Sequence, residues 1–121
     1  MRIFIDQDNV LNQFIRQCAL YVHKLYDIEM TFTPDNCKSW GIFEEMFPYA
    51  SKDSTDRIGE EVFSTPGFWS TMDMQNGAAD AMMRLIHDGH EVYIATMPWP
   101  TARNCIPEKI AWVEKNLPFF N

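Results

Sequence analysis

The chain has 121 residues, 46% of them apolar and 14% aromatic, which suffices for the core of one domain and excludes intrinsic disorder. Ten lysines and arginines against seventeen acidic residues give a net charge of −7, so we expect neither a nucleic-acid polymer nor an anionic membrane as a partner. No apolar run reaches the roughly 20 residues of a membrane span, and Asp6 interrupts the segment where a signal peptide would be apolar. The three cysteines are scattered, as in a reduced protein, and we therefore expect a cytoplasmic location.

Regular elements begin at the second residue. Arg2–Asp6 is a short β-favouring apolar run that stops at acidic residues, which predicts a buried parallel strand followed by a turn over residues 7–9. Apolar residues then recur at helical spacing from Val10 to Leu25 and predict about four turns of amphipathic helix. Residues 27–74 contain prolines, many aromatics and no strand period, so they predict an insertion of short helices and loops. Within the insertion, Ser51–Phe63 has capping residues and one apolar side, which predicts a helix.

The order returns in the last third of the chain. Asn76 is a predicted N-cap, and Gly89 suits the position just after the helix that follows. A strand, Glu91–Thr96, comes directly after this helix. Pro107 is expected in the first turn of a last helix, which Pro118 ends.

These elements predict an α/β fold with a partial Rossmann-like parallel sheet core and a mainly helical cap insertion. We expect a single domain over residues 1–121, with the core formed by residues 1–26 and 75–121 and the cap by about 27–74.

The strongest chemical pattern is the acidic cluster at the exit of the first strand. In doubly wound sheets, ligands bind beyond the carboxyl ends of the strands, where Asp6, Asp8 and Asn9 lie. Two carboxylates at such a turn can converge on one site, one attacking phosphorus and the other handling protons. The alternative is that Asp8 and Asn9 only cap the next helix. A cap needs one such residue, however, and crowded carboxylates raise one another's proton affinity unless a cation lies between them.

Two later residues fit the same site. Thr96 ends the second predicted strand, where its hydroxyl can donate to a phosphate oxygen, although threonine is also ordinary in strands. Lys109 lies in the first turn of the last helix, where a cation is mildly unfavourable unless an anion is near. The alternative for Lys109 is a solvated surface lysine.

At these residues the chain resembles the haloacid-dehalogenase-like (HAD-type) phosphohydrolases, and within them the 5′(3′)-deoxyribonucleotidases. DQDNVL is similar to their first motif, and the strand YIAT is similar to their second, which ends in Thr or Ser. PGFWSTMDMQNGAADAM and TMPWPTARNCIPEKIAWVEKNL resemble two further stretches of the nucleotidases, so the likeness runs from Met1 to about Leu117.

The resemblance implies a magnesium-dependent phosphatase that hydrolyses (deoxy)nucleoside monophosphates. It implies that Asp6 is the nucleophile, forming an aspartyl-phosphate, and that Asp8 protonates the departing oxygen and then activates water. Both would bind Mg²⁺, Asp6 by its side chain and Asp8 by its backbone carbonyl. Thr96 and Lys109 would hold the phosphoryl group.

The resemblance also implies a base-stacking pocket in the cap. Phe14, Trp40 and Trp69 fall at matching places, and flat aromatic rings suit a nucleobase. The alternative is that they belong to the core of the cap.

Departures from the family pattern keep other functions open. Asn9 replaces the usual Gly, and Met97 stands where the family often has a second hydroxyl. The family pattern continues into a strand with a lysine motif and a strand ending in an acidic pair that completes the magnesium site. Neither lies within the 121 residues, so the alternative is a truncated, catalytically impaired relative that binds a nucleotide or a partner chain.

Two further expectations concern the functional class of the protein and its oligomeric state. A phospho-accepting receiver also uses Asp, Thr and Lys around Mg²⁺, but it places the accepting Asp on a later strand and has no long aromatic insertion after the first. A sheet of two strands leaves its edges unpaired, so we expect a homo-oligomer.

Overall fold

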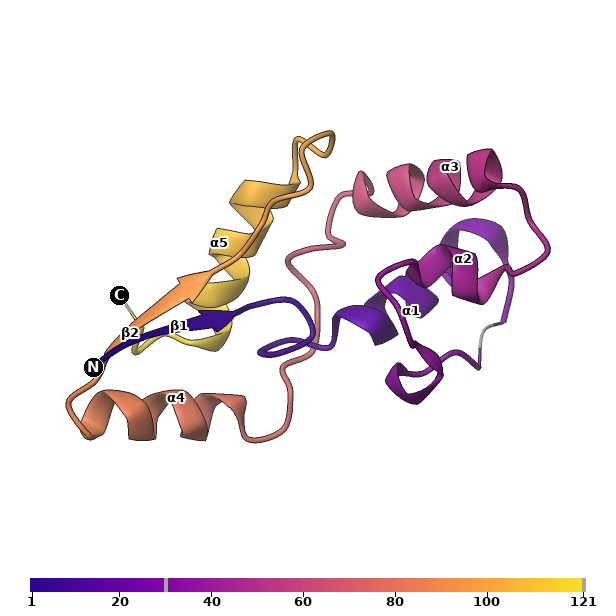
Figure 1. Ribbon diagram of the computed structural model, residues 1–121. Helices are drawn as coiled ribbons and strands as arrows, with labels where there is room; N and C mark the ends of the chain where they lie inside the picture. Colours follow the sequence, from indigo (N-terminus) through magenta and orange to yellow (C-terminus); the bar gives the residue numbers. More distant parts are fainter. Residues whose placement is uncertain (30, 121) are drawn as a thin grey trace.

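A computed structural model describes residues 1–29 and 31–120 (Figure 1). Figure 1 shows two groups of elements joined by loops. Strands β1 and β2 lie with helices α4 and α5, while helices α1, α2 and α3 lie together on the other side. The boundaries that we predicted between core and cap stay a prediction.

The sheet consists of β1 (Arg2–Asp6) and β2 (Glu91–Ala95) within the described residues. The strands are parallel, as predicted, and their register pairs Asp6 with Ala95. Thr96 therefore lies one residue beyond β2 rather than inside it. Both strands alternate between exposed and half-buried residues, so the sheet has one packed face and one open face. The prediction that the first strand is buried was therefore wrong, because no second layer covers its outer face in the described part of the chain.

Helix α4 (Ala78–His87) leads back to the sheet. At its end, Gly89 has φ 87°, its N–H donates to the carbonyl of Ile86, and the N–H of His90 donates to that of Leu85. This is a Schellman motif, and it confirms the predicted place of Gly89.

The predicted N-cap of α4 was wrong. Gly77, not Asn76, occupies the N-cap position, with φ 80° and no side-chain cap. The N–H of Ala78 donates to the carbonyl of Gln75, which closes a turn of type II geometry that requires positive φ at its third residue. Only glycine adopts that φ readily, so the helix starts one residue later than the asparagine suggests.

Helix α1 (Phe14–Tyr26) also begins later than predicted. The N–H groups of Val10, Leu11 and Asn12 all donate to the carbonyl of Gln7, which curls residues 7–12 into a compact turn. The N–H of Gln13 then donates to the carbonyl of Asp73. Val10 is exposed, so its apparent helical spacing was coincidental, whereas Leu11 is buried in the loop.

The predicted insertion contains short helices separated by loops, as expected from its sequence. It contains the 3₁₀ helix η1 (Pro34–Asn36), α2 (Ile42–Met46) and α3 (Lys52–Phe63). Ser51 caps α3, because its hydroxyl accepts a hydrogen bond from the N–H of Ser54 at 3.2 Å.

Helix α5 (Cys105–Asn116) begins two residues before Pro107, which still lies in its first turn. Its N-cap residue, Asn104, makes no side-chain cap. The Asn104 amide instead donates to the carbonyls of Phe63 and Thr65, so it links α5 to the segment after α3.

An aromatic cluster forms the centre of the helical side. The rings of Phe14, Phe63, Phe68 and Trp69 pack with centroid distances from 4.8 to 6.0 Å. None of the helices in residues 1–29 and 31–120 is both long and apolar enough to cross a bilayer.

Candidate functional site

The turn after β1 presents the two predicted catalytic carboxylates. Asp6 is exposed, and its Oδ1 accepts the N–H of Gln7 at 2.8 Å. Asp8 is half-buried, and its Oδ1 accepts a hydrogen bond from the Asn12 amide at 3.2 Å. The turn rests on Gln7, whose side chain is 1% exposed and whose carbonyl receives the three N–H groups described above.

Asn9 lies between the carboxylates and the helix in a left-handed conformation, with φ 59°. Asparagine tolerates this region better than other residues with a side chain, which explains how it can stand where the similar motif has glycine. Its N–H donates to the side chain of Asn12 at 2.8 Å. Asn12 therefore holds the residue on each side of Asp8, because its own N–H donates to the Gln7 carbonyl and its side chain accepts the N–H of Asn9.

Lys109 connects the carboxylate turn to the end of β2. Its side chain is 4% exposed, and its Nζ lies 2.6 Å from Asp8 Oδ2, 2.6 Å from Thr96 Oγ1 and 3.0 Å from the carbonyl of Met97. A lysine has three N–H donors, and these contacts use all of them. The alternative of a solvated surface lysine was wrong.

Two further contacts hold Lys109 in place. The Gln7 amide donates to the Lys109 carbonyl at 3.4 Å, and the ammonium lies 4.9 Å from the centroid of the Trp69 ring. The structure thus joins Asp8, Thr96 and Lys109 in one network and places Asp6 beside it through the strand register.

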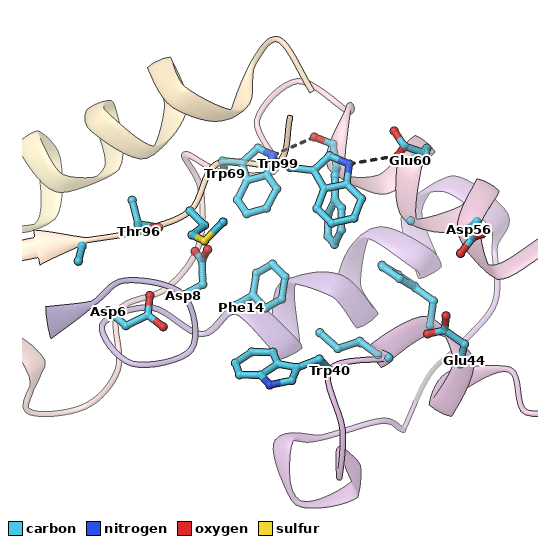
Figure 2. A pocket seen from close by; sticks show the side chains of 17 residues that line it. Asp6, Asp8, Phe14, Trp40, Glu44, Asp56, Glu60, Trp69, Thr96 and Trp99 are labelled. Atoms are coloured by element: carbon cyan, nitrogen blue, oxygen red, sulfur yellow. Dashed lines mark hydrogen bonds between the residues drawn. The ribbon is translucent and has the colours of Figure 1, made fainter. Parts of the chain in front are cut away.

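A cavity of about 870 Å³ opens in front of this network (Figure 2). Such a volume is typical of small-molecule sites. Asp6, Asp8 and Thr96 line one end of it, whereas Lys109 is not among its lining residues. Much of the remaining lining is aromatic or acidic: Phe14, Trp40, Phe43, Phe63, Trp69, Trp99, Glu44, Asp56 and Glu60.

The three predicted stacking residues differ in their surroundings. Phe14 and Trp69 stack with centroids 5.8 Å apart, and Trp69 is buried, with its indole N–H donating to the carbonyl of Phe63 at 2.8 Å. These two rings form a fixed wall and also belong to the aromatic cluster. Trp40 is 90% exposed, and Figure 2 shows it on the opposite side of Phe14 from Trp69.

The donor atoms for a metal ion can be tested against the preferences of Mg²⁺, which favours about six oxygen ligands. The Asp6 carboxylate has no cationic partner among residues 1–29 and 31–120, but the Asp8 side chain is already engaged by Lys109 and Asn12. No group of three or more His, Cys, Asp or Glu residues suited to a metal occurs in the described part of the chain. The oxygen atoms of the turn are therefore of the kind that Mg²⁺ prefers, but they could fill only part of its coordination shell.

The two buried cysteines, Cys18 and Cys105, are poor candidates for a nucleophile. Burial raises the pKa of the Cys105 thiol, although its Sγ accepts the N–H of Trp99 at 3.3 Å. Burial also raises the pKa of Cys18 well above its usual value. Both of these thiols are therefore neutral at ordinary pH and are weak nucleophiles.

A family model described as 5′ nucleotidase, deoxy (pyrimidine), cytosolic type C protein matches residues 1–121. The chain belongs to this nucleotidase family. The membership that the motifs predicted is thereby confirmed, together with an α/β arrangement around a small parallel sheet.

Curated proteins that are similar to this chain also carry the name of a nucleotidase. A protein of Bordetella bronchiseptica (strain RB50) named "Putative 5′(3′)-deoxyribonucleotidase" is 32% identical over 118 residues, covering 97% of this chain and 60% of the relative. A protein of the same name from Bordetella pertussis (strain Tohama I) is 31% identical with the same coverage. The chain thus spans 60% of the length of these relatives.

Several residues of the site in this nucleotidase-family chain were not found from the sequence. Gln7 and Asn12 shape the carboxylate turn, and Glu108 accepts the N–H groups of Gly67 and Trp69. A buried Gln between two Asp residues carried no pattern of its own, and the partners of Glu108 are about 40 residues away in the sequence.

Proposed function

We propose that the chain is a phosphatase that hydrolyses (deoxy)nucleoside monophosphates to a nucleoside and inorganic phosphate. The observation that carries the proposal is the register of the parallel strands, which pairs Asp6 with Ala95 and so sets Thr96 beside the carboxylate turn at one end of an aromatic cavity. Membership of a 5′-nucleotidase family supports the same reaction.

The first half of the proposed reaction uses both carboxylates. The Asp6 carboxylate attacks phosphorus, the bond from phosphorus to the ester oxygen breaks, and Asp8 gives its proton to that departing oxygen. An aspartyl-phosphate and a free nucleoside result. In the second half, Asp8 takes a proton from water, the water oxygen attacks phosphorus, and inorganic phosphate leaves while Asp6 is regenerated.

Lys109 and Thr96 hold the phosphoryl group in this proposal. Because all three N–H donors of Lys109 are engaged by Asp8, Thr96 and the Met97 carbonyl, a phosphate oxygen has to replace one of these acceptors. Displacement of Asp8 is the exchange that also serves catalysis, since it frees the Asp8 carboxylate oxygen that contacts the ammonium for the departing oxygen of the substrate.

The base of the nucleotide stacks in the aromatic part of the cavity. Phe14 and Trp69 provide the fixed wall, and the exposed Trp40 can cover the base from the opening. The volume of the cavity and its aromatic lining suit a nucleoside.

The proposed cofactor is Mg²⁺, held by the Asp6 carboxylate and the Asp8 backbone carbonyl. When bound, it would balance the negative charge of the phosphate and of Asp6. We also propose a cytoplasmic location and self-association of the chain.

The decisive experiment measures inorganic phosphate released from deoxyuridine or thymidine monophosphate in the presence of magnesium. Asp6→Asn should lose activity by on the order of a thousandfold or more, because the amide is a poor nucleophile. The control is Asp80→Asn, which makes the same change of charge at an exposed position of α4. Full activity of Asp6→Asn would refute the mechanism. Nucleotide binding by calorimetry with no phosphate release over hours would identify a binding protein without turnover instead.

A further inference from the structure

One face of α5 holds the backbone of the segment that connects α3 to α4. Asn104, Glu108 and Trp112 are spaced four residues apart, so they lie on the same side of the helix. The Asn104 amide donates to two carbonyls of residues 63–72 at 3.3 and 3.4 Å, and the Trp112 indole donates to the carbonyl of Met72 at 2.7 Å. Both of these side chains are donors, whereas the middle one is an acceptor.

Glu108 uses its two carboxylate oxygens separately. Its Oε2 accepts the N–H of Gly67 at 3.0 Å, and its Oε1 accepts the N–H of Trp69 at 3.0 Å. Glu108 is half-buried, and hydrogen bonds from N–H groups to a carboxylate are stronger than those to a neutral oxygen. The turn that carries Trp69 is therefore fixed by charge-assisted bonds to α5.

The next residue of α5 belongs to the phosphate end of the site. Lys109 contacts Asp8 and Thr96, and its ammonium lies 4.9 Å from the centroid of the Trp69 ring. Two consecutive residues of one helix thus fix the stacking wall and the phosphate-binding cation. Their separation is set by the helix backbone, which is stiff on the scale of a side chain.

We propose that Glu108 is a positioning residue that sets the Trp69 ring at the right distance from the phosphate end for a nucleotide to reach both. The proposal rests on the proposed function, because it assigns the base to the wall that contains Trp69. It predicts that Glu108 acts on ligands that carry a base and leaves ligands without a base unaffected.

The test compares Glu108→Gln with Glu114→Gln, which removes the same charge from an exposed position of α5. A glutamine has one acceptor and one donor in place of two acceptors, so it can satisfy only one of the two N–H groups. Hydrogen exchange of one of the two amides, Gly67 or Trp69, whichever the glutamine leaves without an acceptor, should quicken about tenfold or more in Glu108→Gln alone. If Glu108→Gln does not fold by circular dichroism, Glu108→Asp replaces it, since Asp keeps the charge and shortens the reach.

The functional readout is the KM for thymidine monophosphate against that for deoxyribose 5-phosphate, which lacks a base. We expect Glu108→Gln to raise the KM for thymidine monophosphate about tenfold and to leave the KM for deoxyribose 5-phosphate unchanged. The kcat for each substrate should change by less than about twofold. An equal loss for both substrates, or an unchanged KM for the nucleotide, would overturn the positioning role.

The same ligands measured by calorimetry separate this inference from the proposed function. A wild-type chain that releases no phosphate overturns the phosphatase proposal. A selective loss of nucleotide affinity in Glu108→Gln would still support the role of Glu108. A wild-type chain that binds neither ligand would overturn both.

Discussion

The buried ammonium of Lys109 is the residue on which the rest of the candidate site depends. It lies within 2.6 Å of both Asp8 Oδ2 and Thr96 Oγ1, which come from opposite ends of the sequence. Taking an ammonium out of water is costly unless all of its donors find acceptors, and here they do. The pairing therefore serves both stability and the proposed chemistry.

Replacing this ammonium by an apolar side chain of similar length should be costly. In Lys109→Met, Asp8 loses its cationic partner. Because the Asp8 side chain is 22% exposed, water can hydrate it and compensate for part of this loss. We expect the free energy of unfolding to fall by about 1–3 kcal/mol, measured by urea denaturation, and phosphate release to be lost. Lys115→Met, at an exposed position of α5, is the control, and equal stability of the two variants would contradict the assignment.

The residues of the site that could be predicted are those placed by the pairing of the two strands. Asp6, Asp8 and Thr96 are brought together because carboxyl ends of parallel strands meet at one edge, which follows from the sequence. The three acceptors of Lys109 could not be predicted, since they depend on how α5 docks. Trp40 and Trp69 are both tryptophans in an insertion, and only the packing decides that one is exposed and the other buried.

At the scale of elements, the errors lie where the backbone finds partners that periodicity does not reveal. Apolar spacing from Val10 predicted a helix, but the Gln7 carbonyl takes three N–H groups and delays α1 to Phe14. The turn this creates is what presents Asp8. A local hydrogen-bond network thus overrode helix propensity at the loop of the candidate site, while α3, with its Ser51 cap, formed as predicted.

The Schellman motif after α4 provides a test of the link between helix and sheet. Gly89 has φ 87°, and a Cβ at this position would meet no atom within 4 Å, so a substitution is penalised only by the backbone conformation. Gly89→Ala should lower the free energy of unfolding by about 1 kcal/mol, as measured by urea denaturation. Gly89→Asn should cost less, because asparagine tolerates positive φ. An equal cost for both would show that the lost stability has another origin.

A pH-dependent contact joins α1 to α3. The Tyr26 hydroxyl donates to the Glu61 carboxylate, and desolvation together with this bond raises the pKa of Tyr26 from 10.0 to about 12. The folded chain then holds the proton more tightly than the unfolded chain, so the contribution of the contact is complete below pH 10 and is lost as the pH rises to about 12.

Tyr26→Phe isolates this contribution. The free energy of unfolding of the wild type should fall more steeply than that of the variant between pH 10 and about 12, as followed by urea denaturation at each pH. The difference between two curves removes the titration of other tyrosines and lysines. Parallel curves across this interval would show that the contact adds no stability that depends on the phenol proton.

At the scale of the whole molecule, the sheet has one face that the described residues leave open. Helices α4 and α5 accompany two strands only, and the outward residues Phe4 and Tyr93 are 66% and 45% exposed. Their rings stack on each other with centroids 5.3 Å apart. An exposed aromatic pair on a two-stranded sheet is unfavourable in water, so a second copy that covers it would gain apolar burial.

We therefore expect the chain to self-associate at high micromolar concentration in sedimentation equilibrium. The net charge of −7 repels the copies, so added salt should strengthen the association by screening that repulsion. Phe4→Lys should shift the equilibrium towards monomer, because it replaces part of the aromatic pair by a solvated cation. Leu20→Lys makes the same kind of change at an exposed apolar residue of α1 and should leave association unchanged. A wild-type monomer at every concentration and salt level would show that the open face does not need a partner, whereas an equal effect of both lysines would place the contact elsewhere.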